Sequence, residues 1–344
     1  MTSPRLAPRA AGAAVASALV VVAVLVSLAI GARAIDPLTI VDVLLGSATG
    51  RSTTGLGAPE VDAIVIVELR IPRTLIGLAA GAALGLAGAV MQGVTRNPIA
   101  DPGLLGVNAG ASFAVVIAIS VLGVGSPLGI ATGALLGALL ASVLIAIVAA
   151  STRSLTTPAV LVVAGAAVTA GLTSLTTLVL LSDPAALDRY RFWTVGSLTG
   201  RDLELATALV PLLLLGGILA AFLARPLDAL ALGDDVARGL GFRLRSTRAL
   251  SLASIVLLCG TATALAGPLV FVGLLAAHAA RALVGTRHGI LLPTSALLGA
   301  AALLVADTLG RVVAPPAEIE VGIVIAVLGA PLLIGLVRSA RVAV

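Results

Sequence analysis

Long stretches without a charged residue constrain this chain more than any other feature of its sequence. The longest covers residues 102–152, which is 51 residues between Asp101 and Arg153. A bilayer core about 30 Å thick is crossed by roughly 20 helical residues, so this stretch predicts two crossings with a turn between Gly123 and Pro127. The composition agrees, because 59% of the residues are hydrophobic and 11% are charged, whereas soluble domains are about half apolar and a quarter charged. We therefore expect an all-α integral membrane protein.

The charge-free stretches together predict ten transmembrane helices. Residues 249–280 are counted as two helices because Gly267-Pro268 interrupts them. With ten crossings and both termini in the cytoplasm, most arginines lie on the cytoplasmic side, as is usual in membrane proteins. If residues 249–280 crossed only once, most arginines would lie on the outer side. We treat residues 1–344 as one transmembrane domain with a cytoplasmic region at 228–248. The stretches are 10–32, 74–95, 102–152, 154–182, 205–224, 249–280, 289–306 and 321–337.

The first stretch has an alternative interpretation as a secretory signal. Arg5 and Arg9 precede it, and the segment from Ala32 to Ala34 resembles a cleavage site. The apolar run at 10–32 is longer than the core of a secretory signal, which has about 7–15 residues. We therefore expect an uncleaved first helix.

The polar residues exclude several kinds of catalytic site. All 21 basic residues are arginine, so the sequence lacks the lysine of a phosphate-binding P-loop. One cysteine, Cys259, and two histidines, His278 and His288, leave little from which to build a metal site. Aromatic residues make up 2% of the chain and the arginines are scattered, which argues against nucleic-acid binding. We expect a transport protein that is not an enzyme and that holds no metal or cofactor of its own.

One acidic residue lies within a predicted span. Asp307 precedes Arg311 by four residues, a spacing that places both side chains on one face of a helix and suits an ion pair. We favour this structural role over the alternative, a proton relay. A chain without a nucleotide site or an ion relay needs a partner that supplies energy.

The longest charged cytoplasmic loop, from Arg225 to Arg248, offers an attachment point for such a partner. Residues 232–241 read LGDDVARGLG. This segment predicts a short amphipathic helix that ends at glycine, with Asp234 and Asp235 in its first turn. The alternative is a solvated connector that binds no partner.

Four segments, in this order, resemble the FecCD family of ABC importer permeases, which serve iron(III)-siderophores, haem and cobalamin. The resemblance covers the chain from about residue 60 to its end. The segments are RIPRTLIGLAAGAALGLAGAVMQGVTRNPIADPGLLGVNAGAS at 70–112, LGDDVARGLG at 232–241, GPLVFVGLLAAHAAR at 267–281 and LLPTSALLGAAALLVADTLGR at 291–311.

The resemblance implies the architecture of a type II ABC importer permease, in the cytoplasmic membrane of a prokaryote. Such a subunit pairs with a copy of itself or with a related permease. Two cytoplasmic ATPase subunits bind ATP and magnesium beneath the pair, and an extracytoplasmic binding protein delivers the substrate from above. An iron(III)-siderophore is the expected substrate, and cobalamin or haem is the alternative. A secondary transporter working alone is the rival from another class.

The resemblance also assigns roles to individual residues of this sequence. Ala277 departs from the family pattern, which usually has proline at this position before the histidine. For residues 97–103, the alternative to a role in the translocation path is a plain structural turn on the cytoplasmic side. The ATPase-coupling residues are Leu232, Gly233, Asp234, Asp235, Val236, Ala237, Arg238, Gly239, Leu240 and Gly241; the binding-protein docking residues are Arg70, Arg73 and Arg311; the translocation or gate candidates are Asn97, Pro98, Asp101, Pro102, Gly103, Thr156 and Thr157.

Overall fold

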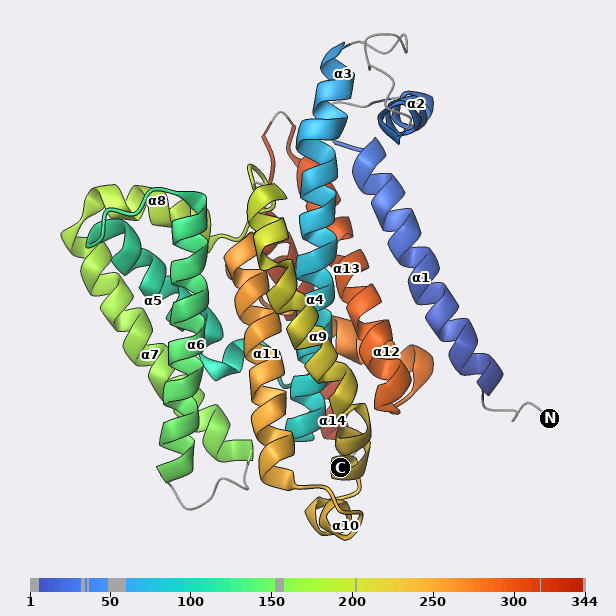
Figure 1. Cartoon of the computed structure of the whole chain (residues 1–344), viewed down its shortest axis with the longest axis vertical. Helices are drawn as coiled ribbons and strands as arrows, with labels where there is room; N and C mark the ends of the chain where they lie inside the picture. The colour runs from blue at the N-terminus through green and yellow to red at the C-terminus, as the bar shows by residue number, and fades with distance from the viewer. Residues whose placement is uncertain are drawn as a thin grey trace.

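The computed structural model describes residues 6–31, 35, 37–48, 60–151, 158–201, 203–315 and 317–342. Every regular element in these ranges is a helix, and most of the helices run along one common direction (Figure 1). The all-α prediction is therefore confirmed for the described residues. The elements are α1 (Leu6–Ala29), α2 (Pro37–Ala48), α3 (Glu60–Ile64), the π-helical turn η2 (Val65–Arg70), α4 (Ile71–Thr95), the 3₁₀ turn η3 (Pro102–Leu105), α5 (Val107–Ser120), α6 (Pro127–Ser151), α7 (Pro158–Ser182), α8 (Pro184–Thr194), α9 (Leu203–Ala231), α10 (Asp234–Gly239), α11 (Leu244–Ala266), α12 (Val272–Val284), α13 (His288–Val313) and α14 (Val321–Val342).

Seven helices among the described residues are long and apolar enough to cross a membrane, and three further apolar helices are shorter. The shorter ones are Val107–Ser120, Val272–Val284 and Val321–Gly335. Together they occupy the segments from which ten crossings are predicted. The predicted turn before Pro127 and the predicted break at Gly267-Pro268 are both confirmed, because no described helix continues through either of them. The number of crossings and the side on which the termini lie stay predictions.

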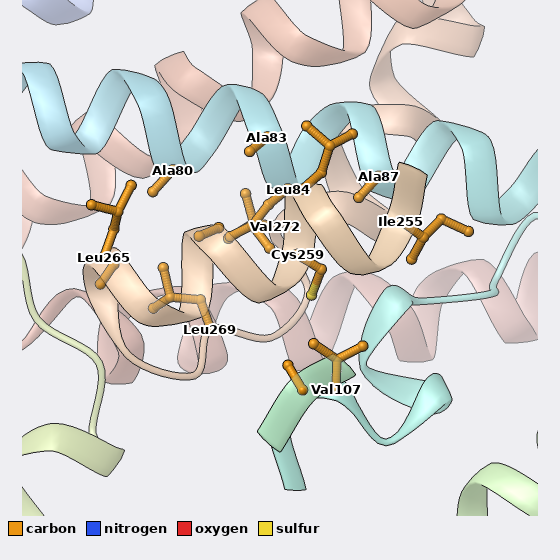
Figure 2. Packing of buried hydrophobic residues seen from close by; sticks show 14 of the residues in the cluster. Ala80, Ala83, Leu84, Ala87, Val107, Ile255, Cys259, Leu265, Leu269 and Val272 are labelled. Atoms are coloured by element: carbon orange, nitrogen blue, oxygen red, sulfur yellow. The ribbon is translucent and has the colours of Figure 1, made fainter. Parts of the chain in front are cut away.

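Helix α4 lies at the centre of the bundle and packs against α9, α11, α12 and α13. Small residues bring it close to its neighbours. A Cβ atom on Gly81 would lie 2.5 Å from the carbonyl oxygen of Gly299 in α13, so only glycine fits there. Ala83 is buried on the same helix and lies near Val272 of α12 (Figure 2). Such contacts between small residues allow helix backbones to approach closely in lipid.

Helices α5 and α12 are shorter than a membrane crossing, and irregular backbone precedes each. Helix α5 has 14 residues, which corresponds to a length of about 21 Å. Its first residue, Val107, lies beside Cys259, well inside α11 (Figure 2). The cytoplasmic turn expected at residues 97–103 therefore begins a longer segment, 97–106, that returns into the bundle. Non-helical backbone at membrane depth is tolerated when protein surrounds it.

Side-chain hydrogen bonds hold this segment and the start of α5 to the irregular residues 267–271. Asn108 in the first turn of α5 accepts a bond from Thr263 Oγ1 at 3.0 Å, and its Nδ2 donates to the carbonyl of Leu269 at 3.5 Å. Asp101 accepts from the backbone amide of Gly103 at 2.8 Å and also from that of Phe271. The amides of Gly103 and Phe271 and the carbonyl of Leu269 thus find partners within the protein.

Candidate functional sites at the two ends of the bundle

The two ends of the bundle carry different polar features. One end bears α10 and is called the α10 end; the opposite end bears α2, α3 and α8 and is called the α3 end (Figure 1). The predicted coupling residues lie at the α10 end. The predicted docking arginines lie at the α3 end, so the structure separates the two predicted sites along the length of the bundle.

Helix α10 and the residues beside it present exposed apolar side chains. Val236 of α10 is 47% exposed, and Leu232 before the helix and Leu240 at its C-cap are 66% and 60% exposed. Ala237 of the same helix is fully buried against the bundle. The short amphipathic helix predicted from the sequence is therefore confirmed, and Gly233 and Gly241 flank it with φ angles of 107° and 87°. The coupling role of this segment stays a prediction.

Asp234 fastens α10 to two helices of the bundle. Its Oδ1 lies 3.2 Å from Nη2 of Arg96 at the end of α4, and its Oδ2 accepts from Nη2 of Arg248 in α11 at 2.8 Å. Arg96 has a φ of 53° at the C-cap of α4, a left-handed conformation that a non-glycine residue seldom adopts. By contrast, Asp235 and Arg238 pair with each other at 2.6 Å on the exposed surface. Asp234 thus connects α10 to the bundle, whereas Asp235 pairs within α10.

A second carboxylate joins two helices near this end. Asp228 of α9 accepts from the backbone amide of His288 at 2.8 Å and lies 2.7 Å from its Nδ1. The ring of His288 is buried against Gly93 of α4, where a Cβ would come within 2.6 Å of Nε2. No local pattern predicts this contact, because Asp228 and His288 are 60 residues apart.

At the α3 end, Asp307 of α13 is the centre of an ion-pair network. Its predicted pair with Arg311 is confirmed at 3.2 Å. A closer partner is Arg73 of α4, whose Nη2 donates to Asp307 at 2.8 Å and whose Nε lies 3.0 Å from both carboxylate oxygens. The other terminal nitrogen of Arg73 donates to Glu318 at 2.8 Å. The two arginines and the two carboxylates of this network therefore neutralise one another within the chain.

Arg70 and Arg311 bind the last carbonyl groups of α1. Arg70 Nη1 donates to the carbonyls of Leu28 at 2.6 Å and Ala29 at 2.9 Å. Arg311 donates to the carbonyl and the hydroxyl of Ser27, both at 3.0 Å. Cationic donors suit the C-terminal end of a helix, where unpaired carbonyls concentrate partial negative charge. The two arginines are 5% and 3% exposed.

The three predicted docking arginines line one pocket, which has a volume of about 270 Å³. A fourth arginine, Arg201, joins them from the segment between α8 and α9, and sequence reasoning missed it. Glu68 and Glu318 supply the acidic groups. Burial lowers the pKa of Arg201 from its ordinary value, and the nearby charge of Glu320 only partly opposes this effect. The pocket walls are Gly31, Val65, Glu68, Leu69, Arg70, Arg73, Leu198, Thr199, Gly200, Arg201, Arg311 and Glu318.

The predicted gate residues that the structure describes all lie in the segment 97–103. Asn97 and Asp101 each accept a nearby backbone amide, that of Ile99 at 3.1 Å and that of Gly103 at 2.8 Å, as residues of a structural turn do. Thr156 and Thr157 lie outside the described residues. Within the described ranges, no three histidine, cysteine or acidic side chains are grouped so that they could hold a metal ion.

Comparison with known proteins places this geometry in a family. The chain is 43% identical over 325 residues to the ferric enterobactin transport system permease protein of Escherichia coli, which covers 93% of this chain and 92% of that protein. It is 38% identical over 335 residues to the iron(3+)-hydroxamate import system permease protein of Bacillus subtilis, covering 95% and 96%. The fold matches a structure described as an inward-facing conformation of a metal-chelate type ABC transporter, with a TM-score of 0.78, 27% identity and coverage of 96% and 99%. The model of the FecCD transport family matches residues 19–339, and the chain belongs to that family.

Proposed function

We propose that this chain is the membrane-spanning permease subunit of an ATP-binding-cassette importer that carries a ferric siderophore across the cytoplasmic membrane of a prokaryote. The observation that carries the proposal is similarity, over more than nine tenths of the chain, to permeases of iron(III) chelates. The sequence contains no lysine for a P-loop. A separate ATPase therefore binds ATP and magnesium and supplies the energy.

Helix α10 is the proposed contact with that ATPase. Exposed Val236 on this helix, with exposed Leu232 and Leu240 on either side of it, forms an apolar ridge. A ridge of this kind fits a groove on a partner protein, as amphipathic helices do in helix-in-groove recognition. Asp234 connects the ridge to α4 and α11, so a movement of α10 is passed to the helices at the centre of the bundle.

A second permease subunit is the proposed neighbour of α7. The membrane-spanning part of this helix is 17% buried, the smallest share among the candidate spans. Its exposed residues include the hydroxyl-bearing Thr173, Ser174 and Thr177 beside Gly171. Small and hydroxyl-bearing residues are typical of helix contacts and of polar passages within membranes rather than of surfaces that face lipid. The substrate path then lies between two permeases, which are either identical or related.

The arginine pocket at the α3 end is the proposed docking site for an extracytoplasmic binding protein. It brings Arg70, Arg73 and Arg311 together on the end of the bundle opposite to α10. Asn97, Pro98, Asp101, Pro102 and Gly103 stay gate candidates because their segment returns into the bundle, and Thr156 and Thr157 stay candidates from their family position alone.

Reconstitution tests the proposal. The chain is placed in liposomes with its ATPase and binding protein, and uptake of radiolabelled ferric enterobactin, a ferric hydroxamate, ferric citrate and cobalamin is compared with and without ATP. We expect ATP-dependent uptake of an iron chelate. Uptake of cobalamin alone would establish the alternative substrate, and uptake driven by an ion gradient without the ATPase would reject the proposal in favour of a secondary transporter.

A further inference from the structure

Helix α2 is short, lies crosswise and is largely apolar. In Figure 1 it is seen nearly along its own axis beside the end of α1, so it lies across the common direction of the long helices. Its 12 residues correspond to a length of about 18 Å, which is too short to cross a bilayer core. Only Thr39, Asp42 and Ser47 among them have polar side chains. A helix of this composition is normally enclosed, either by protein or by lipid.

Protein covers one face of α2. Ile40 and Val43, three residues apart, are 6% and 0% exposed. They belong to one apolar cluster with Leu28 at the end of α1 and with Ala63 and Ile66 of α3 and η2. This packing fixes the rotation of α2 about its own axis, and it attaches α2 to α1 and to the helical segment that leads into α4.

The opposite face of α2 is exposed. Leu38, Val41 and Leu45 are 73%, 50% and 60% exposed, and their spacing of three and then four residues places them on one face of the helix. None of these three residues lines the arginine pocket. An exposed strip of large aliphatic side chains is typical of a surface that contacts another protein or a membrane.

We infer that α2 is an interfacial helix that lies at the boundary of the lipid leaflet at the α3 end, with Leu38, Val41 and Leu45 in contact with acyl chains. The strip continues a surface that faces lipid, because only 28% of the apolar span of α1 is buried. The 24 residues of α1, about 36 Å long, suffice to cross a bilayer core. The end of α1 therefore lies near the boundary of the bilayer, and α2 packs on Leu28 at that level.

The position and charge of α2 favour lipid over a protein partner. The helix lies beside α1, on the side of the bundle away from α7, where the second permease is proposed (Figure 1). Asp42 is its only charged residue, so α2 has little of the charge that commonly steers a protein partner. A helix held in lipid in this way ties the ends of α1 and α3 to the membrane surface.

Spin labels test the inference in the assembled transporter. Val41→Cys is made in a Cys259→Ala background, labelled with a nitroxide and reconstituted with the ATPase in liposomes of phosphatidylethanolamine and phosphatidylglycerol. Molecular oxygen concentrates among acyl chains, whereas a nickel chelate stays in water. We expect oxygen to relax the Val41 label more than the nickel chelate does, as for a label at Leu25 of α1, which is 60% exposed. A label at Thr199, exposed at the same end, is the control in water and should show the reverse order.

Three results would overturn the inference. If the nickel chelate reaches the Val41 label as readily as the Thr199 label, the strip faces water. If the Val41 label becomes protected from nickel only after the binding protein is added, the strip belongs to the contact with that protein. If neither oxygen nor nickel reaches the label, protein covers the strip.

A fluorescence measurement checks the same contact without a spin label. Trp193 is the only tryptophan of the chain and is buried, so the wild type gives the background signal. We expect lipids brominated on their acyl chains to quench the added fluorescence of Val41→Trp and to leave that of Thr199→Trp unchanged. Equal fluorescence of Val41→Trp in brominated and ordinary lipids would contradict the inference.

Discussion

Arg73 and Asp307 form a bidentate ion pair across 234 residues of sequence, with one nitrogen to oxygen distance of 2.8 Å and two of 3.0 Å. The pair joins α4 to α13, which are the two most extensively packed helices of the bundle. Asp307 is 1% exposed, and Arg311 shares it from the other side. One buried carboxylate thus pairs with two arginines, one from α4 and one from α13.

Removal of this carboxylate is expected to destabilise the protein strongly. Asp307→Asn removes the ion-pair partner of buried Arg311 and leaves Arg73 with Glu318 alone; removing one partner of a buried ion pair costs about 3–5 kcal/mol. Thermal unfolding of the detergent-solubilised protein, followed by size-exclusion chromatography, measures the change. Asp188→Asn is the control, because Asp188 pairs with Arg191 on the exposed surface of α8 and such pairs contribute about 0–1 kcal/mol. Equal midpoints for the two variants would contradict the central role of Asp307.

The apolar ridge of α10 is expected to set the affinity for the ATPase. Val236→Asp removes the central exposed side chain of the ridge and introduces a charge that must be desolvated in a groove. We expect ATPase co-purification to fall at least tenfold, with membrane insertion unchanged. Arg238→Ala, on the same helix but in an exposed pair with Asp235, serves as a comparison and should lose much less. Full co-purification with Val236→Asp would remove α10 from the interface.

Asp234 is expected to affect coupling rather than attachment. Asp234→Asn weakens the links to Arg96 and Arg248 and leaves the exposed ridge of α10 intact. The ATPase should therefore still bind and hydrolyse ATP, whereas substrate uptake per ATP hydrolysed should fall severalfold. Parallel assays of hydrolysis and uptake in the same liposomes give this ratio. An unchanged ratio would mean that α10 passes its movement to the bundle by another route.

The stability contributed by Asp183 is expected to vary with pH only in the acid range. Hydrogen bonds from the amide of Ala186, the hydroxyl of Ser120 and the amide of Ala185 lower the pKa of Asp183 below its ordinary value of 3.8. A carboxyl group whose pKa is lower in the folded state stabilises that state above the unfolded pKa and loses the effect as pH falls through the folded pKa. The difference in melting temperature between wild type and Asp183→Asn should therefore be constant near neutral pH and shrink below about pH 4. A difference that disappears between pH 5 and 7 would contradict this assignment.

Features that depend on neighbouring residues could be predicted from the sequence. The break at Gly267-Pro268, the short helix at 232–241 and the pair of Asp307 with Arg311 all follow from local spacing or backbone preference. Apolar length also identified the helices, because lipid requires long uncharged segments whatever the tertiary contacts are.

Contacts between distant segments could not be predicted in the same way. Nothing near Arg201 in the sequence indicates that it lines a pocket with Arg70, and nothing near Arg70 indicates that it binds the end of α1. The return of residues 97–106 into the bundle was missed for a related reason. A segment without charged residues can be either a helix that spans the membrane or irregular backbone that other helices surround.

The attachment of α1 has a consequence for biosynthesis. The carbonyl of Ser27 accepts a hydrogen bond from the side chain of Arg311, which the ribosome synthesises 284 residues later. At about 5–20 residues per second, that interval is roughly 14 to 57 seconds. During it, α1 resides in the membrane with the last carbonyls of the helix lacking this donor, and a nascent chain stalled before α13 never acquires it. The carbonyl of Ser27 therefore gains its arginine donor only after α13 has been synthesised, whereas Arg70 can donate to the carbonyls of Leu28 and Ala29 much earlier.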